Sequence, residues 1–123
     1  MRLGNDAMIA VLIPCYNEEN TIGMVIDDFR MELPTAGIYV FDNNSTDESP
    51  TISREHNAVV IREPRQGKGF VVESMFGQIQ ADVYVLVDGD ATYSAAHVHQ
   101  LIEPVRNGQA DMVVATRLAA HSD

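Results

Sequence analysis

The chain has little of what several classes of protein depend on. Cys15 is the one cysteine among 123 residues, so no disulfide can form within the chain. No apolar run is long enough to span a bilayer, and the N-terminal stretch lacks the layout of a signal peptide. These absences predict a protein of a reducing compartment, located in the cytoplasm or at the cytoplasmic face of a membrane.

Basic residues are also scarce. The sequence has 8 Lys and Arg against 18 Asp and Glu, which gives a net charge of -10. A nucleic-acid-binding protein would normally carry a basic patch, so this class is disfavoured. An acidic protein that handles phosphates usually needs a metal cation to offset the repulsion.

What is present is an apolar pattern that alternates between strand and helix periods. Hydrophobic residues make up 46% of the chain, enough for a single domain over 1–123, in which 1–6 form a short and poorly ordered polar lead-in. Helices are expected to start near Asn20, Ser49, Gly69 and Ser94. The buried stripe of the third helix is expected to consist of Val72, Met75, Phe76 and Ile79. Strands are expected at 8–13, where Pro14 stops the run, and at 37–41, 58–61, 83–87 and 112–115. The pattern predicts a three-layer α/β/α fold with a mostly parallel sheet.

Polar clusters follow three of these strands, at 14–19, 42–47 and 88–92. Ligands of parallel α/β sheets bind at the carboxyl ends of the strands, so the clusters predict one shared site. Asp88 and Asp90, separated by Gly89, could hold a divalent cation through oxygen ligands. The alternative is a chance D-x-D in an acidic chain.

Three further residues have two readings each. Asp42 could hydrogen-bond a ribose or base, or form an Asx turn. Tyr16 could lie against a base, or be a half-buried turn residue. Lys68, between two glycines at a helix start, could attract phosphate, or belong to an ordinary loop. Neither G-x-G-x-x-G nor a P-loop is present, and Cys15 is expected to be a packed residue.

Five motifs occur in order along nearly the whole chain. They are Pro14-Cys15-Tyr16-Asn17-Glu18, Asp42-Asn43-Asn44-Ser45-Thr46-Asp47, Gln66-Gly67-Lys68-Gly69, Asp88-Gly89-Asp90 and Ala115-Thr116-Arg117. Together they resemble the P-x-Y-N-E, D-[DN]-x-S-x-D, x-G-K-G, D-x-D and G-S-R motifs of family 2 glycosyltransferases with the GT-A fold. The most similar subgroup is the polyprenyl-phosphate (dolichol-phosphate) sugar synthases. Asn43-Asn44 replaces the commoner Asp-Gly, which predicts a difference in the turn.

The resemblance implies a role for each matching residue. The donor, a UDP- or GDP-sugar, would be bound by Pro14, Tyr16, Asn17, Glu18, Asp42, Asn44, Lys68, Asp88 and Gly89. Asp90, with Asp88, would hold Mg²⁺ or Mn²⁺ on the diphosphate, and these two acids are the expected catalytic residues. Arg117 would lie near the phosphate of a lipid-phosphate acceptor.

The chain ends soon after the fifth expected strand, whereas family members continue with an acceptor-binding half that supplies any general base. The expectation is therefore the donor-binding half of a glycosyltransferase. Two alternatives stay open: a non-catalytic nucleotide-sugar-binding fragment, and a D-x-D-x-T phosphatase. In the GT-A fold a later strand lies between the fourth and fifth, so its absence predicts an unpaired sheet edge and self-association.

Overall fold

The computed structural model describes residues 8–87, 95–106 and 113–115, and within them the chain forms a five-stranded sheet. The strands are β1 (Ile9–Cys15), β2 (Gly37–Asp42), β3 (Val59–Arg62), β4 (Val83–Val87) and β5 (Val113–Ala115), in the spatial order β3-β2-β1-β4-β5. Each neighbouring pair is parallel. The predicted parallel sheet is confirmed.

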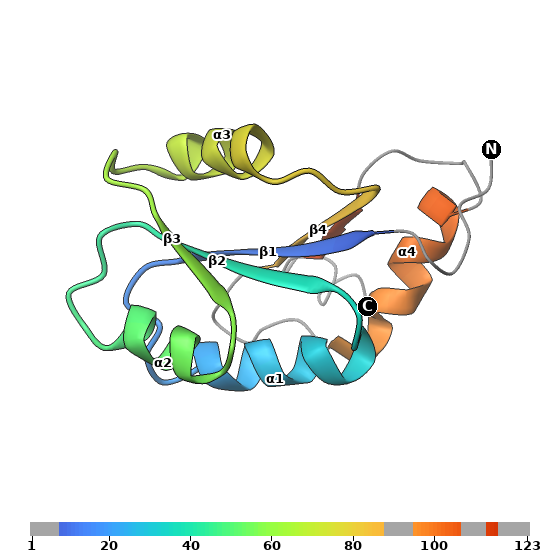
Figure 1. Cartoon of the computed structure of the whole chain (residues 1–123), viewed down its shortest axis with the longest axis horizontal. Helices are drawn as coiled ribbons and strands as arrows, with labels where there is room; N and C mark the ends of the chain where they lie inside the picture. Colours follow the sequence, from blue (N-terminus) through green and yellow to red (C-terminus); the bar gives the residue numbers. More distant parts are fainter. Residues whose placement is uncertain (1–7, 88–94, 107–112, 116–123) are drawn as a thin grey trace, which may run out of the picture.

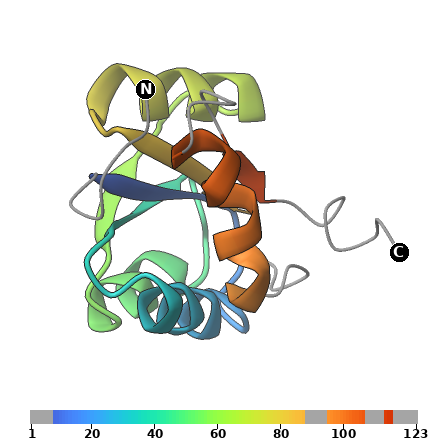
Figure 2. The ribbon, with the colours of Figure 1, turned by 90° about the vertical axis from the view of Figure 1, so that its right-hand side faces the viewer.

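Helices cover both faces of the sheet (Figure 1). They are α1 (Ile22–Glu32), α2 (Ser49–Glu55), α3 (Lys68–Gln78) and α4 (Val98–Arg106), with a short 3-10 helix, η1 (Ala95–His97), before α4. Viewed along the strands, α3 lies on one face, and α1 and α2 lie on the other (Figure 2). This is the three-layer α/β/α arrangement expected from the sequence.

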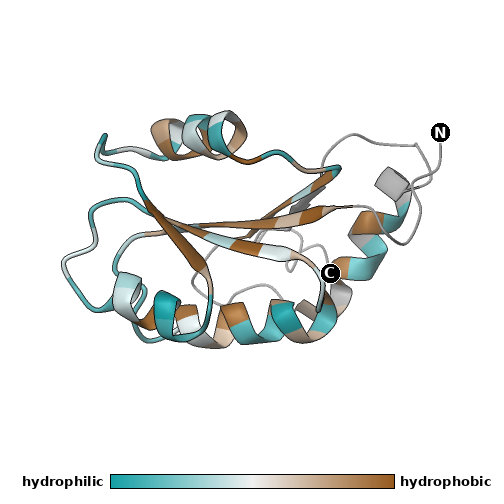
Figure 3. Ribbon diagram, in the orientation of Figure 1, coloured by the Kyte–Doolittle hydropathy of each residue, from teal (hydrophilic) through white to brown (hydrophobic). Residues whose placement is uncertain are grey.

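The alternation of side chains along β1 supplies both halves of the core. Val11 and Ile13 pack with the α1 side of the sheet, whereas Ala10 and Leu12 pack with α3. Successive residues of a strand point to opposite faces, so a strand buried on both sides reads as one continuous apolar run. In Figure 3 the strands are largely hydrophobic and the loops at their carboxyl ends are hydrophilic. The polar site therefore lies at this rim, outside the core.

Several local predictions need correction. Pro14 does not end β1, because the strand continues to Cys15 and Pro14 lies opposite Phe41 of β2. Among the described residues β1 pairs with β4 only as far as Leu12, and a position beyond that pairing, where no N–H is needed, tolerates proline. Phe76 is not part of the buried stripe of α3: it is 39% exposed and packs edge-on against Tyr84, with ring centroids 5.1 Å apart.

The helix starts also differ slightly from the prediction. The residue before α1 is Thr21, not Asn20, and Ser49 is the first residue of α2 instead of its cap. Ser94 lies outside the described residues. The shifts are one residue each, the usual uncertainty of helix boundaries.

The expected gap between the fourth and fifth strands is absent. Val85, Leu86 and Val87 of β4 lie directly opposite Val113, Val114 and Ala115 of β5. Direct pairing provides hydrogen-bond partners for backbone groups of β4 and β5 that were predicted to be unpaired. Within the parts described, no helix is both long and apolar enough to cross a membrane.

Candidate functional site

The carboxyl ends of β1 and β2 form the centre of the rim. Cys15 and Asp42, the last residues of these strands, lie opposite each other, and the backbone N–H of Asn43 donates to the carbonyl of Cys15 at 2.9 Å. The two loops that follow therefore leave the sheet side by side. Sequence clusters that are 28 residues apart are brought together by this register.

Asn17 joins the first loop to the second. Its backbone N–H donates to Ser45 Oγ at 2.9 Å, and its side-chain Oδ1 accepts from the backbone N–H of Thr46 at 2.8 Å. Asn17 has a φ of 52°, a left-handed conformation that asparagine tolerates better than most residues. The backbone N–H and the side-chain oxygen of Asn17 thus both hold the two loops together.

The carboxylate of Asp47 extends this connection. Asp47 accepts a hydrogen bond from the backbone N–H of Glu19 at 3.2 Å. It also accepts two from Ser49, one from the backbone N–H at 2.9 Å and one from the hydroxyl group at 2.6 Å. Ser49 Oγ in turn accepts from the backbone N–H of Glu18 at 2.8 Å. Burial alone would raise the pKa of Asp47, but the hydrogen bonds from Ser49 and Glu19 bring that pKa below its ordinary value. The acid of the S-x-D motif therefore organises the loops as a carboxylate.

Cys15 does not have the properties of a nucleophile. Its side chain is 2% exposed, and burial raises the pKa of the thiol to about 12, with the charges of Asp42 and Glu18 acting in the same direction. A thiol that stays protonated is unreactive. This observation agrees with the expectation of a packed residue.

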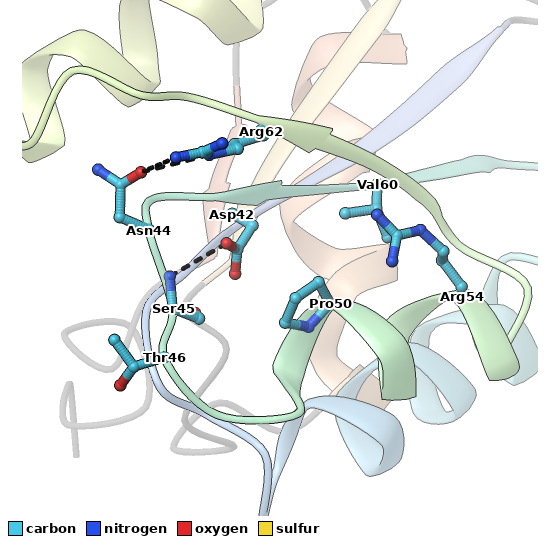
Figure 4. Close-up of a pocket in the computed structure, with 8 residues that line it drawn as sticks. All are labelled: Asp42, Asn44, Ser45, Thr46, Pro50, Arg54, Val60 and Arg62. Atoms are coloured by element: carbon cyan, nitrogen blue, oxygen red, sulfur yellow. Dashed lines mark hydrogen bonds between the residues drawn. The ribbon is translucent and has the colours of Figure 1, made fainter.

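A cavity of about 400 Å³ opens between the end of the sheet and α2 (Figure 4). Its floor is Asp42, which is 4% exposed and accepts from the backbone N–H of Ser45 through Oδ2 at 3.1 Å. The other carboxylate oxygen, Oδ1, is buried and has no hydrogen-bond partner among the described residues. The cavity is lined by Asp42, Asn44, Ser45, Thr46, Pro50, Arg54, Val60 and Arg62.

Two arginines line the same cavity as this carboxylate. In Figure 4 Arg62 comes from the end of β3 and Arg54 from α2. Arg62 donates from Nε and Nη2 to Asn44 Oδ1 at 3.4 and 3.3 Å. Val60 and Pro50 supply apolar surface between the charged groups. The cavity therefore combines one buried acceptor, two arginine side chains and an apolar surface.

Asn44 has the left-handed conformation that the commoner glycine would adopt at its position, with a φ of 67°. The turn after β2 therefore does not need glycine, and the difference from the motif is absorbed by asparagine. The Nδ2 group of Asn44 donates to the carbonyl of Pro64 and to Gln66 Oε1, both at 3.0 Å. Its side chain is thus occupied by the loop after β3.

The loop after β3 contains a buried acid. Glu63 is 3% exposed, is paired with Arg65 at 3.0 Å and accepts the hydroxyl hydrogen of Ser74. Hydrogen bonds from Arg65 and Ser74 lower the pKa of Glu63 to about 2. Arg65 also pairs with Glu73 and lies over the ring of Phe70, 4.7 Å from its centroid. Arg65 is therefore committed to the loop and is not a ligand donor.

The remaining predicted residues lie at the rim without lining the cavity. Tyr16 is 51% exposed, Pro14 and Glu18 are half-buried, and Lys68 is the exposed first residue of α3. Asp88, Gly89, Asp90 and Arg117 lie outside the described residues. Within the described ranges, no group of three His, Cys, Asp or Glu could hold a metal.

Sequence reasoning missed Arg54 and Arg62. A signal was available, because four of the chain's eight basic residues lie between positions 54 and 68. A cluster of basic residues in a chain of net charge -10 indicates a local function for them, such as contact with an anionic ligand.

Parallel strands, a polar rim at their carboxyl ends and a cavity at that rim define an α/β protein with a candidate ligand site in the usual place for such sheets. The family model described as "Glycosyl transferase family 2" matches residues 10–123, and the chain belongs to this family. The resemblance inferred from the five motifs is confirmed.

Individual relatives agree with the family. The chain is 50% identical over 109 residues to protein RfbJ of Shigella flexneri, covering 89% of this chain and 84% of RfbJ. It is 31% identical over 110 residues to a dolichyl-phosphate hexose transferase of Haloferax volcanii, covering 89% of this chain and 48% of that protein.

Solved structures share the fold. Glucosyl-3-phosphoglycerate synthase from Mycobacterium tuberculosis superimposes with a TM-score of 0.75 at 26% identity, over 85% of this chain and 42% of the synthase. That enzyme has also been crystallised with Mn²⁺ and UDP-glucose. The chain thus spans less than half the length of this synthase and about half that of the hexose transferase. The GT-A fold expected from the sequence is confirmed.

Proposed function

We propose that the chain binds the nucleoside diphosphate of a sugar donor, with a uracil base in the cavity at Asp42, as the donor site of a glycosyltransferase. The observation that carries this proposal is the buried Oδ1 of Asp42, which has no partner among the described residues. Leaving a buried acceptor unpaired costs about 1–3 kcal/mol, and more for a charged group. A ligand N–H that reaches this oxygen would offset the cost.

The neighbours of Asp42 favour one base over another. The cavity holds one carboxylate acceptor and two arginine donors, a set that suits a base with one ring N–H and two carbonyl groups. Uracil has this edge. Guanine has a carbonyl on one side of its ring N–H and an amino group on the other, so it offers only one carbonyl to the two arginines of the cavity. The arrangement therefore supports a UDP-sugar over a GDP-sugar, in agreement with the UDP complexes of the Mycobacterium tuberculosis synthase.

Asp90, with Asp88, is the proposed holder of Mg²⁺ or Mn²⁺. Both acids come directly after β4, which pairs with β1 and so reaches the same rim as Asp42. Carboxylates are suitable ligands for these hard cations, and a chain of net charge -10 needs a cation to receive a diphosphate. When bound, the metal stabilises the negative charge of the leaving nucleoside diphosphate. Lys68 adds positive charge at the start of α3.

The remaining donor residues are proposed in the roles implied by the motifs. Tyr16 is exposed at the rim, where its ring can lie against the nucleoside. Asn17 and Asn44 act indirectly, because their side chains already hold the rim loops. Pro14 and Glu18 shape the first loop.

For the acceptor we propose a lipid phosphate, with Arg117 near its phosphate group. The similarity to a dolichyl-phosphate hexose transferase supports this choice. A phosphate acceptor is already an anion, so it needs little help from a general base. The reaction would then take place at the cytoplasmic face of a membrane. Self-association through the edge strand β3, on which Val59 is 53% exposed, is proposed as well.

Calorimetric titration tests the donor site. We expect UDP to bind in Mn²⁺, to bind more weakly in EDTA, and to bind more tightly than GDP. Asp90→Ala should remove the effect of the metal, whereas Asp28→Ala, a change of an exposed acid on α1, should not. Absence of UDP binding by folded protein would refute the proposal.

A second experiment separates an enzyme from a non-catalytic binding fragment. UDP-sugar is incubated with the chain and Mn²⁺, with and without a polyprenyl phosphate, and hydrolysis and transfer are measured. Product that disappears in Asp90→Ala supports catalysis. Binding without any product supports the fragment alternative.

A further inference from the structure

Asn43 is a buried amide that connects β2 to the loop after β3. Its side chain is 6% exposed. Nδ2 donates to the carbonyl of Glu63 at 2.8 Å and to that of Arg65 at 3.0 Å, while Oδ1 accepts from the backbone N–H of Gly67 at 3.0 Å and from Gln66 Nε2 at 3.2 Å. Both donors and the acceptor of this amide are therefore used on a single loop.

That loop determines where α3 begins. Gly67 has a φ of 137°, which an L side chain rarely adopts, and Lys68 is the next residue and the first of the helix. Since the Gly67 N–H is bound to Asn43, the side chain fixes the backbone one residue before Lys68. Asn43 also follows Asp42 directly, so the cavity floor and the start of α3 are linked through one residue.

We propose that Asn43 is a positioning residue that sets the start of α3, and with it Lys68, relative to the Asp42 cavity. The inference rests on the proposed function, in which Lys68 lies on the diphosphate side and Asp42 on the base side. It follows that Asn43 acts on binding of the diphosphate and leaves the nucleoside contacts intact.

The chemistry of the amide explains why a carboxylate would act differently. An aspartate at position 43 could accept from the N–H of Gly67 but could not donate to the carbonyls of Glu63 and Arg65. Its charge would instead face those two carbonyl oxygens. Asn43→Asp therefore keeps one half of the connection and loses the other, and Asn43→Ala loses both.

The experiment compares UDP with uridine on the wild type, Asn43→Ala, Asn43→Asp and a control, Gln78→Ala, which changes an exposed amide at the far end of α3. Affinities are measured by calorimetry in Mn²⁺, and exchange of the Gly67 amide proton by NMR. We expect Asn43→Ala to weaken UDP binding by about tenfold with uridine unchanged, and to accelerate Gly67 exchange. Asn43→Asp should be intermediate, and the control should match the wild type.

Equal losses for UDP and uridine in a folded Asn43→Ala would overturn the inference, and so would unchanged Gly67 exchange. If Asn43→Ala does not fold, Asn43→Asp carries the same comparison. Failure of the wild type to bind either ligand would overturn the proposed function instead, and the exchange measurement would still report whether Asn43 holds the loop.

Discussion

Replacing Asp42 by asparagine should weaken donor binding while leaving the protein as stable as before, or more stable. The Ser45 N–H needs an acceptor, so the new amide is expected to place its oxygen there and its NH2 group where Oδ1 now lies. A donor then faces the N–H of the base. Losing a hydrogen bond to a charged group costs about 1.5–3 kcal/mol, which is about 10- to 150-fold in affinity for UDP.

Stability should change in the opposite direction. The wild type keeps a carboxylate oxygen buried without a partner among the described residues, and the neutral amide removes the cost of burying that charge. We expect the free energy of unfolding of the unliganded protein to rise by up to about 1 kcal/mol, because the NH2 group still lacks an acceptor. Urea denaturation measures this change, and calorimetry measures the affinity.

Asp47→Asn provides the matched control. Asp47 accepts hydrogen bonds from Ser49 and Glu19, so its loss should destabilise the free protein. The sign of the change in unfolding free energy therefore distinguishes Asp42, a carboxylate for ligand binding, from Asp47, a carboxylate that holds the loops. If Asp42→Asn destabilises the protein and leaves UDP affinity unchanged, Asp42 is a structural residue and the reasoning is wrong.

Three further predictions concern other charged or reactive groups. Arg54→Ala should reduce the preference for UDP over GDP by about tenfold in competition binding, since it removes one of the two arginine donors that line the cavity. Equal effects on both nucleotides would contradict the assigned base. Cys15 should stay unmodified by a thiol reagent at pH 8 in the folded protein and react after denaturation, because its pKa is about 12; rapid reaction of folded protein would be inconsistent with its burial. Folding lowers the pKa of Glu63 from 4.5 to about 2, so its contribution to the free energy of unfolding is present above pH 4.5 and is lost as pH falls toward 2. Glu63→Gln should therefore reduce the dependence of the unfolding free energy on pH between these values. An unchanged dependence would show that Glu63 does not contribute.

Much of the fold could be predicted because the apolar pattern has one interpretation. β4 has three buried valines on one face and no charged residue, and α1 repeats its buried residues at helical spacing. Pro14 was misjudged because proline signals an end only where its missing N–H would be needed. The direct pairing of β4 with β5 could not be read from the sequence, because strand order depends on tertiary contacts.

The site was predicted in part. The motifs identified Asp42, and the register of β1 and β2 brings its loop next to that of Asn17, as the rim clusters suggested. The motifs did not distinguish residues that contact the ligand from residues that hold the loops. The side chains of Asn17, Asn44 and Asp47 form hydrogen bonds within the protein, in the loops around the site. Arg54 was missed because it lies in the last turn of a helix, where a basic residue is usually explained by the helix dipole alone.

The reciprocal bonding of the two rim loops has a consequence for how this site can vary in evolution. Asn17 holds Thr46, Glu19 accepts from the N–H of Glu48, and Asp47 accepts from the N–H of Glu19. The partners on the opposite loop are backbone N–H groups, which every residue except proline supplies. Asn17, Glu19 and Asp47 are therefore each constrained by their own acceptor oxygen, and no side-chain substitution in the facing loop can compensate for the loss of one of them.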